Sequence, residues 1–261
     1  MNLDVAKEVE EIVRSQGATP ATIAIIDGEI FVGLEEDQLI RIANDDNIVK
    51  ASTRDLAIIC AEGKSAATTV AATSHIARLA DIDVFATGGL GGVHRGHLYD
   101  ESADLIELAK TKVIIVCAGV KSILDVAGTL ERLETLAIPV LGFATNNFPG
   151  FYLTDSGFKI EHRVESAGEI AKIWNMRHGL NTDDTAIIIA NPVANQMDKA
   201  FHDEILDAGL AAAIKMKISG KGVTPFLLEH FHTTSNGESL RVNIEIIKAN
   251  SKLAAQIACA L

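Results

Sequence analysis

The chain has 261 residues, with 23 lysines and arginines against 35 aspartates and glutamates, and so a formal net charge of −12. This acidic balance argues against a nucleic-acid-binding protein, because phosphate backbones are bound by basic surfaces. Hydrophobic residues make up 48% of the chain, which excludes a disordered protein, and no apolar run approaches the roughly 18 residues of a membrane span.

The first predicted elements are a helix and a hairpin. Apolar residues recur at helical spacing over 3–16, and Gly17 closes that helix. Two short apolar runs follow at 21–26 and 30–32, separated by Asp27-Gly28, a dipeptide typical of a hairpin turn. The sequence therefore predicts a helix followed by a β-hairpin.

From there, short apolar runs alternate with helical stretches. Apolar runs without polar alternation indicate parallel strands buried on both faces, with the intervening helices as crossovers. The predicted strands are 56–60, 84–86, 113–117, 140–143 and 186–190, and the predicted helices are 66–79, 122–136, 167–178 and a largely helical tail from 198 that closes with 240–261. We predict one α/β domain over 1–261, with ligands bound beyond the carboxyl ends of the strands.

The first of the strand-end segments contains Gly63-Lys64-Ser65. A phosphate-binding P-loop needs a glycine five positions before Gly63, where Ile58 stands, so a nucleoside triphosphatase is excluded. A cradle for an anionic group at a helix start and a plain cap and turn both remain open.

A glycine-rich loop follows the predicted strand 84–86. It contains five glycines between residues 88 and 96, which indicates positive φ angles and close backbone approach to a ligand. His94 and His97 lie in this loop, and Asp100, Glu101 and Asp104 follow it. Imidazole and carboxylate groups so close together could hold Mg²⁺ or Mn²⁺ rather than zinc. The alternative is that the acidic residues cap and charge the next helix.

Lys121 follows the predicted strand 113–117, where the helix 122–136 is expected to begin. The positive end of a helix dipole disfavours an ammonium group and lowers its pKa. A partly neutral amine there could attack a sugar carbon and form a Schiff base, whereas the alternative is a solvated surface lysine. Asn191 and Asn243 also follow or lie in predicted elements, and for both a structural role is favoured.

The three cysteines, Cys60, Cys117 and Cys259, lie far apart in apolar stretches and fit no zinc-binding spacing. They are typical of small buried side chains in a reducing compartment. The first residues contain no apolar signal-peptide core. We therefore expect a cytoplasmic protein.

Motifs from the first helix to the end of the chain resemble those of pseudouridine-5′-phosphate glycosidases. They are Gly17-Ala-Thr-Pro20, Gly63-Lys64, Phe85-Ala-Thr-Gly-Gly-Leu-Gly-Gly-Val-His-Arg-Gly96, Cys117-Ala-Gly-Val-Lys-Ser-Ile-Leu-Asp125 and Thr224-Pro-Phe-Leu-Leu228. The resemblance implies a three-layer α/β/α fold with a largely parallel central sheet, a Mn²⁺ cofactor and a homotrimer. It also implies reversible cleavage of the C–C glycosidic bond of pseudouridine 5′-phosphate into uracil and ribose 5-phosphate, with these small molecules as partners.

The resemblance also implies roles for ten residues of this chain. Lys121 matches the catalytic lysine that forms an imine with C1 of the opened ribose, and His94 matches a histidine near the base and the sugar. Asp100 matches the metal-binding aspartate. The matches to substrate-contacting positions are Lys50, Val70, Ser102, Ala103 and Asp104, with Thr87 and Asn243 as contacts to phosphate or sugar.

One departure from the family pattern concerns the beginning of the sequence. Members of the family begin with a further apolar strand, whose Ala-Leu-Glu-Ser-Thr-type motif supplies the glutamate that moves the proton at the uracil carbon. This sequence starts after that segment, and Glu8, Glu10 and Glu11 lie in the predicted helix instead. We therefore expect weak binding of the sugar phosphate and little or no release of uracil. The alternatives are a truncated or non-catalytic homologue that binds a sugar phosphate, and another imine-forming lyase.

Overall fold

The computed structural model describes residues 3–96, 100–218 and 222–261. Its main sheet contains five parallel strands in the order β5 (Val84–Ala86), β6 (Ile114–Cys117), β9 (Ile187–Ala190), β7 (Val140–Phe143) and β8 (His162–Val164). Four of these strands were predicted from their apolar runs, and β8, with two exposed side chains, was not. The largely parallel central sheet is confirmed.

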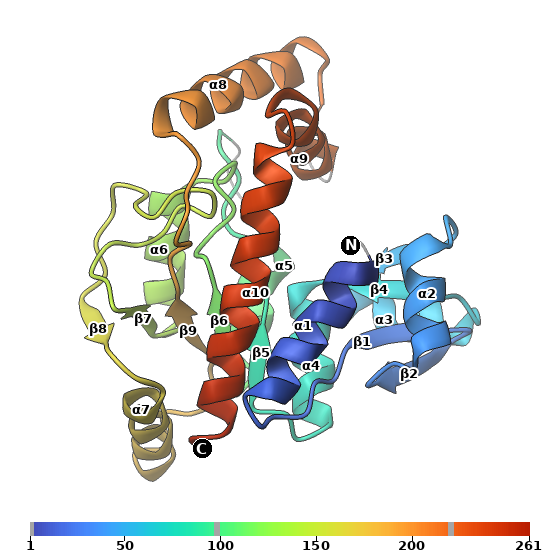
Figure 1. Ribbon diagram of the computed structural model, residues 1–261, viewed down its shortest axis with the longest axis vertical. Helices are drawn as coiled ribbons and strands as arrows, with labels where there is room; N and C mark the ends of the chain where they lie inside the picture. Colours follow the sequence, from blue (N-terminus) through green and yellow to red (C-terminus); the bar gives the residue numbers. More distant parts are fainter. Residues whose placement is uncertain (1–2, 97–99, 219–221) are drawn as a thin grey trace.

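Successive residues of the central strands point to opposite faces of the main sheet. Ile115 and Cys117 pack in a cluster with side chains from α4 (Val70–Leu79), α5 (Ala103–Leu108) and α6 (Val126–Thr135). Ile114 and Val116 pack against α7 (Ala167–Gly179) and α10 (Glu238–Ala258). Helices on both faces of one parallel sheet make the predicted three-layer α/β/α arrangement (Figure 1).

A second, smaller sheet was not predicted. Its strands run in the order β2 (Glu29–Val32), β1 (Ile23–Ile26), β4 (Ala66–Thr68) and β3 (Val49–Ala51), and α1 (Leu3–Ser15), α2 (Glu36–Asn44), a 3₁₀ turn (Thr53–Asp55) and α3 (Leu56–Ala61) accompany them. The predicted hairpin is β1–β2, and both Asp27 and Gly28 have the positive φ of a type I′ turn. Helix α4 packs on both sheets, because Ile76 joins the core of the small sheet and Val70 that of the main sheet.

Two of the predicted elements are wrong in the small-sheet region. Residues 56–60, predicted as a strand, form α3, and the predicted helix 66–79 begins as strand β4 before α4 starts at Val70. A short apolar run fits a buried strand and a buried helix equally well, so the sequence pattern could not distinguish them.

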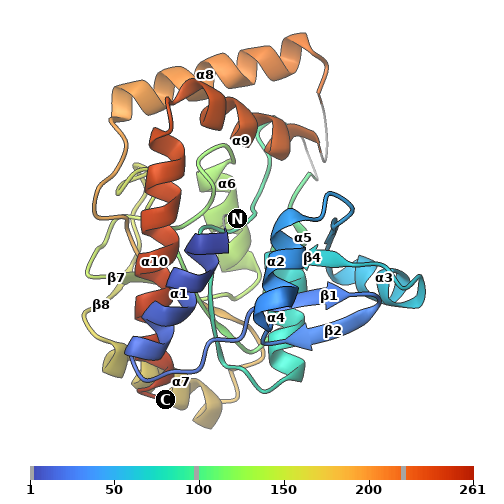
Figure 2. The same ribbon diagram turned by 45° about the vertical axis from the view of Figure 1, so that its right-hand side comes forward.

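Helices α8 (Lys199–Lys215) and α9 (Val223–Thr234) pair beyond the carboxyl ends of the main strands, beside the start of α10 (Figures 1 and 2). Phe231 and Leu227 of α9 pack there with Phe148, Phe151 and other buried side chains. The predicted helical tail is confirmed, and it covers the edge of the sheet where ligands were expected. In the described part of the chain, no helix combines the length and apolarity needed to cross a membrane.

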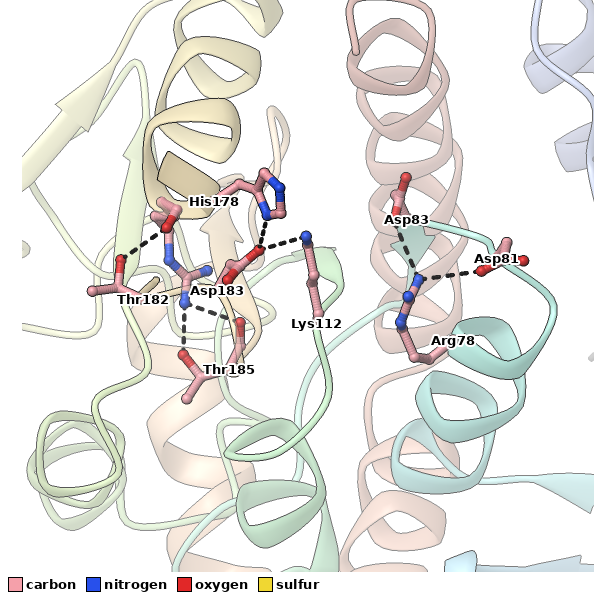
Figure 3. A network of polar contacts seen from close by, with 9 residues as sticks. Arg78, Asp81, Asp83, Lys112, His178, Thr182, Asp183 and Thr185 are labelled. Atoms are coloured by element: carbon pink, nitrogen blue, oxygen red, sulfur yellow. Dashed lines mark hydrogen bonds and ion pairs between the residues drawn. The ribbon is translucent and has the colours of Figure 1, made fainter. Parts of the chain in front are cut away.

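A polar network lies at the amino ends of the main strands, on the side of the sheet opposite to α8 and α9 (Figure 3). Asp183 precedes β9, and one of its carboxylate oxygens accepts hydrogen bonds from Lys112 Nζ at 2.5 Å and His178 Nδ1 at 2.8 Å. The Lys112 ammonium also lies 5.3 Å from the centre of the Trp174 ring. The two ends of the main strands therefore differ. Ion pairs lie at the amino ends, and a cavity lies at the carboxyl ends.

Candidate active site

A cavity of about 880 Å³ lies at the carboxyl ends of the main strands, where the small sheet approaches them. Strands β5 and β6 lead into it, and β3 and the 3₁₀ turn supply residues from the other side. All ten predicted site residues line this one cavity: Lys50, Val70, Thr87, His94, Asp100, Ser102, Ala103, Asp104, Lys121 and Asn243. The structure thus brings together side chains that are spread over 194 positions of sequence, Lys50 to Asn243 counted inclusively.

Lys121 lies in the loop between β6 and α6. Its backbone N–H donates to the Leu90 carbonyl at 3.2 Å, and its carbonyl accepts from Leu124 N–H at 2.9 Å. In the described part of the chain its amine has no hydrogen bond or ion pair. Burial lowers the pKa of Lys121, the Asp104 charge opposes this, and Lys50 lowers the pKa further.

The predicted cause of that lowered pKa was wrong. Helix α6 begins at Val126, after the capping residue Asp125, so Lys121 does not stand at a helix N-terminus. Gly119, with φ of +79°, turns the chain sharply after β6, and a Cβ there would lie 2.1 Å from the Pro149 carbonyl oxygen. The pKa of Lys121 is lowered by its position in the cavity wall and not by a helix dipole.

The glycine-rich loop is built for close packing. A Cβ at Gly89 would lie 2.7 Å from Phe151 Cδ2, one at Gly91 2.3 Å from Ser102 Oγ, and one at Gly92 2.3 Å from Thr129 Oγ1. Among the five glycines only Gly96 has a positive φ. The predicted positive φ is therefore confirmed for Gly96 and wrong for the other four, which are glycines because of close packing.

Asp104 fastens this loop to α4. The carboxylate is buried, and its oxygens accept from the backbone N–H groups of Ala71 at 3.0 Å and Gly91 at 2.9 Å. The neighbouring Glu101 forms a two-point ion pair with Arg132 at 2.7 and 2.9 Å. Both carboxylates therefore have structural partners already.

Asp100 differs from those two carboxylates. Its carbonyl accepts from His94 N–H at 2.9 Å, but in the described residues its carboxylate has no partner. Nor do the described residues contain a group of three or more His, Cys, Asp or Glu side chains that could hold a metal ion, and His97 lies outside them. A hard cation is commonly bound through one or two carboxylates together with water and substrate oxygens, so Asp100 fits Mn²⁺ by donor chemistry.

The Gly63-Lys64-Ser65 segment does not form an anion cradle. Lys64 is exposed and pairs with Glu62 at 2.6 Å, and Ser65 accepts from the Asp27 amide at 2.9 Å. None of the three residues lines the cavity. Of the two alternatives left open, the turn is the one observed.

Several residues of the cavity wall were missed. Arg54 lies in the 3₁₀ turn that follows β3, and its charge within a Ser-Thr-Arg-Asp segment was an available signal. Phe151, in the segment Phe148-Pro-Gly-Phe151, has φ of +61° and donates its amide to the Ala118 carbonyl at 3.0 Å. Nothing in the local sequence distinguishes that phenylalanine, because its place depends on packing against Gly88 and Gly89.

The sequence model of the indigoidine synthase A-like proteins matches residues 1–260. Pseudouridine-5′-phosphate glycosidases from Salinispora tropica and Streptomyces griseus are each 51% identical to this chain, over 99% of it and 81% of their own length. The chain belongs to the pseudouridine-5′-phosphate glycosidase family. The resemblance inferred from the motifs is thereby confirmed.

Two solved structures extend the family relationship to three dimensions. An indigoidine synthase A-like protein from Thermotoga maritima has a TM-score of 0.90 at 37% identity and covers 98% of this chain and 85% of its own. The prealnumycin C-glycosynthase AlnA was solved in complex with ribulose 5-phosphate. It has a TM-score of 0.93 at 32% identity, and the match covers 99% of this chain and 86% of AlnA. The fold of the family is therefore the fold of this chain.

Proposed function

We propose that the protein reversibly cleaves the C–C glycosidic bond of pseudouridine 5′-phosphate, giving uracil and ribose 5-phosphate. The names of its relatives support this activity. The observation that carries it is Lys121, whose amine lies unpaired in the cavity wall with its pKa lowered by burial. A lysine in that state is a nucleophile for a sugar carbon.

The reaction begins when the neutral Lys121 nitrogen bonds to C1 of the ribose and the ring oxygen leaves C1. The nitrogen gives up one proton and the ring oxygen takes one, which restores the nitrogen lone pair. That lone pair then forms the C=N bond as the C1–uracil bond breaks. The electrons of that bond leave with the uracil carbon, which takes a proton. Water hydrolyses the imine, which releases ribose 5-phosphate and restores the amine. Since no oxygen links the sugar to the base, the carboxylate pair of ordinary glycosidases would not serve here.

Charge around the cavity agrees with a phosphorylated substrate. Lys50 of β3 and Arg54 of the 3₁₀ turn line the cavity, together with four carboxylates, of which Glu101 is paired with Arg132 and Asp104 is held by backbone amides. A phosphate is attracted by Lys50 and Arg54 even in a protein of net charge −12. We assign Lys50, Val70, Ser102, Ala103 and Asp104 to substrate contact and Thr87 and Asn243 to the phosphate or sugar.

Mn²⁺ is the proposed cofactor, with Asp100 as its protein ligand. A divalent cation there would neutralise substrate phosphate or uracil oxygens. Homotrimer formation and a cytoplasmic location stay predictions, and light scattering of the purified protein measures the first directly.

Two measurements test the assignment. Uracil release from pseudouridine 5′-phosphate is followed by chromatography, and borohydride reduction in the presence of ribose 5-phosphate traps the imine for peptide mass spectrometry. We expect the adduct on Lys121, none in Lys121→Ala, and a normal adduct in the control Lys64→Ala, which alters an exposed lysine outside the cavity. An adduct on another lysine, or none on folded protein, would contradict the mechanism.

A second candidate is a protein that binds a sugar phosphate without cleaving a C–C bond. It is favoured by one observation, that Glu101 and Asp104 are held by Arg132 and by backbone amides and so are not free to transfer a proton. Calorimetric titration with ribose 5-phosphate, beside the uracil assay, separates the two: binding without uracil release would establish the second candidate.

A further inference from the structure

Two asparagine side chains lie against the inner end of the cavity wall. Asn250 of α10 is 1% exposed, and its Nδ2 donates to the Thr87 carbonyl at 2.7 Å. Its Oδ1 accepts from Asn191 Nδ2 at 2.9 Å. Neither asparagine lines the cavity itself, so Asn191 does not reach a ligand there.

The orientation of the Asn250 amide is fixed by its partners. A carbonyl oxygen can only accept, so the NH₂ group must face Thr87, and the remaining oxygen must then accept from Asn191. Thr87 follows β5 and donates its N–H to Val116 at 3.0 Å, while Asn191 follows β9 and donates its N–H to Cys117 at 2.8 Å. Asn250 therefore joins α10 to the ends of the two strands on either side of β6.

The same helix carries Asn243 into the cavity wall. Asn243 lies seven residues before Asn250, which is about two turns, so the two side chains share one face of α10. Asn243 Oδ1 lies 3.4 Å from the position that a Cβ of Gly88 would occupy. The bond from Asn250 to Thr87 thus joins α10, which is also held by the apolar packing of Val242, Ile246 and Leu253, to the chain beside the glycine-rich loop that faces Asn243.

We propose that Asn250 is a positioning residue, which holds α10 on the Thr87 carbonyl so that Asn243 and Thr87 meet the same group of a bound sugar phosphate. The inference rests on the proposed function, since it assumes that this cavity takes a phosphorylated sugar. Asn250 itself touches no ligand and acts through Asn243.

Asn250→Asp is the main test, because it preserves shape and the acceptor for Asn191 but replaces the donor facing Thr87 by a carboxylate oxygen. We expect the Kd for ribose 5-phosphate to rise about tenfold, the loss that follows when a buried hydrogen bond is broken and its acceptor left unpaired. The matched control is Asn44→Asp on α2, where an exposed asparagine also donates to a backbone carbonyl, at 2.9 Å. The control should bind like the parent.

A double-mutant cycle separates positioning from simple destabilisation. If Asn250 acts through Asn243, then in an Asn243→Ala background the increase in the Kd for ribose 5-phosphate that Asn250→Asp causes should fall below threefold. In the uracil assay, Asn250→Asp should raise KM and leave kcat within threefold of the parent. Full additivity in the cycle, unchanged binding in Asn250→Asp, or no effect of Asn243→Ala overturns the proposal.

Folding is checked by circular dichroism on every variant. If Asn250→Asp does not fold, Asn250→Ala takes its place in the same cycle, because it removes the bond to Thr87 without placing a carboxylate against the Thr87 carbonyl. Failure of both variants to fold would show a purely structural role and overturn the proposal. The parent's own Kd for ribose 5-phosphate tests the proposed function, whereas the ratio of variant to parent tests the positioning role.

Discussion

Lys121 and Lys50 bring two amines to one cavity, Lys121 from the loop after β6 and Lys50 from β3. Burial lowers the pKa of Lys121 most, and the charge of Lys50 acts in the same direction, while Asp104 opposes both. The neutral amine is the reactive form, so imine formation should increase as pH rises through the lowered pKa of Lys121.

Lys50→Gln tests this arrangement. Removal of the Lys50 charge removes one influence that lowers the pKa of Lys121, so the midpoint of imine formation should move to higher pH. Borohydride trapping at saturating ribose 5-phosphate between pH 6 and 10 measures that midpoint, with Lys64→Gln as the unaffected control. A midpoint that stays in place or moves to lower pH would show that Lys50 does not act on the amine.

Gly119 is the residue at which backbone geometry limits the site most. Gly119→Ala combines a positive φ with a Cβ 2.1 Å from a backbone oxygen that cannot move freely, whereas Gly33→Ala has a φ of +85° and open space. The control should lose about 1–2 kcal/mol of unfolding free energy from the left-handed conformation alone. Gly119→Ala should lose more than the control and also lose imine formation. Urea unfolding of both variants checks this, and equal losses would contradict the steric argument.

At this scale the sequence was informative where a polar residue follows a strand. Lys121 and Asp100 could be predicted because they are chemically reactive types in strand-end segments. Phe151 and Asn250 could not, because an apolar residue and a helical asparagine give no local sign of the partners that they meet across the fold.

Helix α4 packs on both sheets, and Asp104 attaches it to the glycine-rich loop. Asp104→Asn turns one acceptor into a donor that faces a backbone N–H. The variant should lose about 1–3 kcal/mol of unfolding free energy, because a buried amide is left without a partner.

Asp100→Asn is the comparison for that change. The Asp100 carboxylate of the parent has no partner in the described residues. The unfolding free energy of Asp100→Asn should therefore stay within about 0.5 kcal/mol of the parent. Its Mn²⁺ affinity should fall instead, as measured by electron paramagnetic resonance titration. Tight Mn²⁺ binding by Asp100→Asn would show that Asp100 is not the metal ligand.

Element prediction succeeded where length and flanking residues were distinctive, as in α7, α10 and the hairpin β1–β2, and failed at β3, α3 and β4. The six residues of α3 are mostly apolar, and a turn of helix and a short strand leave the same pattern in so short a run. Strand β3, with two exposed residues of three, gives too little apolar signal to be predicted.

For the whole molecule, the network around Asp183, opposite the cavity, contributes stability that depends on pH. The hydrogen bond from Lys112, with that from His178, holds the pKa of Asp183 at about 2, below its ordinary value of 3.8. The contribution of the ionised Asp183 to the free energy of unfolding is therefore fully present above about pH 4 and is lost as pH falls through 4 toward 2. Asp183→Asn should be less stable than the parent at pH 6, and the difference should shrink in urea unfolding at pH 3. A difference independent of pH would contradict this account.

The arrangement into two sheets could not be predicted from the order of elements alone. Alternating strands and helices indicate a parallel sheet, and that held for the five main strands. Strands β1 to β4 form a sheet of their own, and α4 buries Ile76 in the core of that sheet and Val70 in the core of the main sheet.

The packing of α1 on α10 also governs when the protein can finish folding during its synthesis. Gln256 donates a hydrogen bond to Gln16, 240 positions away in the chain. At about 5–20 residues per second, a ribosome needs on the order of 10–50 s to make that stretch, and α1 must wait for its partner helix throughout. Nascent chains stalled before residue 238 should therefore be cut by protease at α1, while chains extended past α10 resist. The packing of α1 is therefore completed only after α10, which is made much later, has left the ribosome.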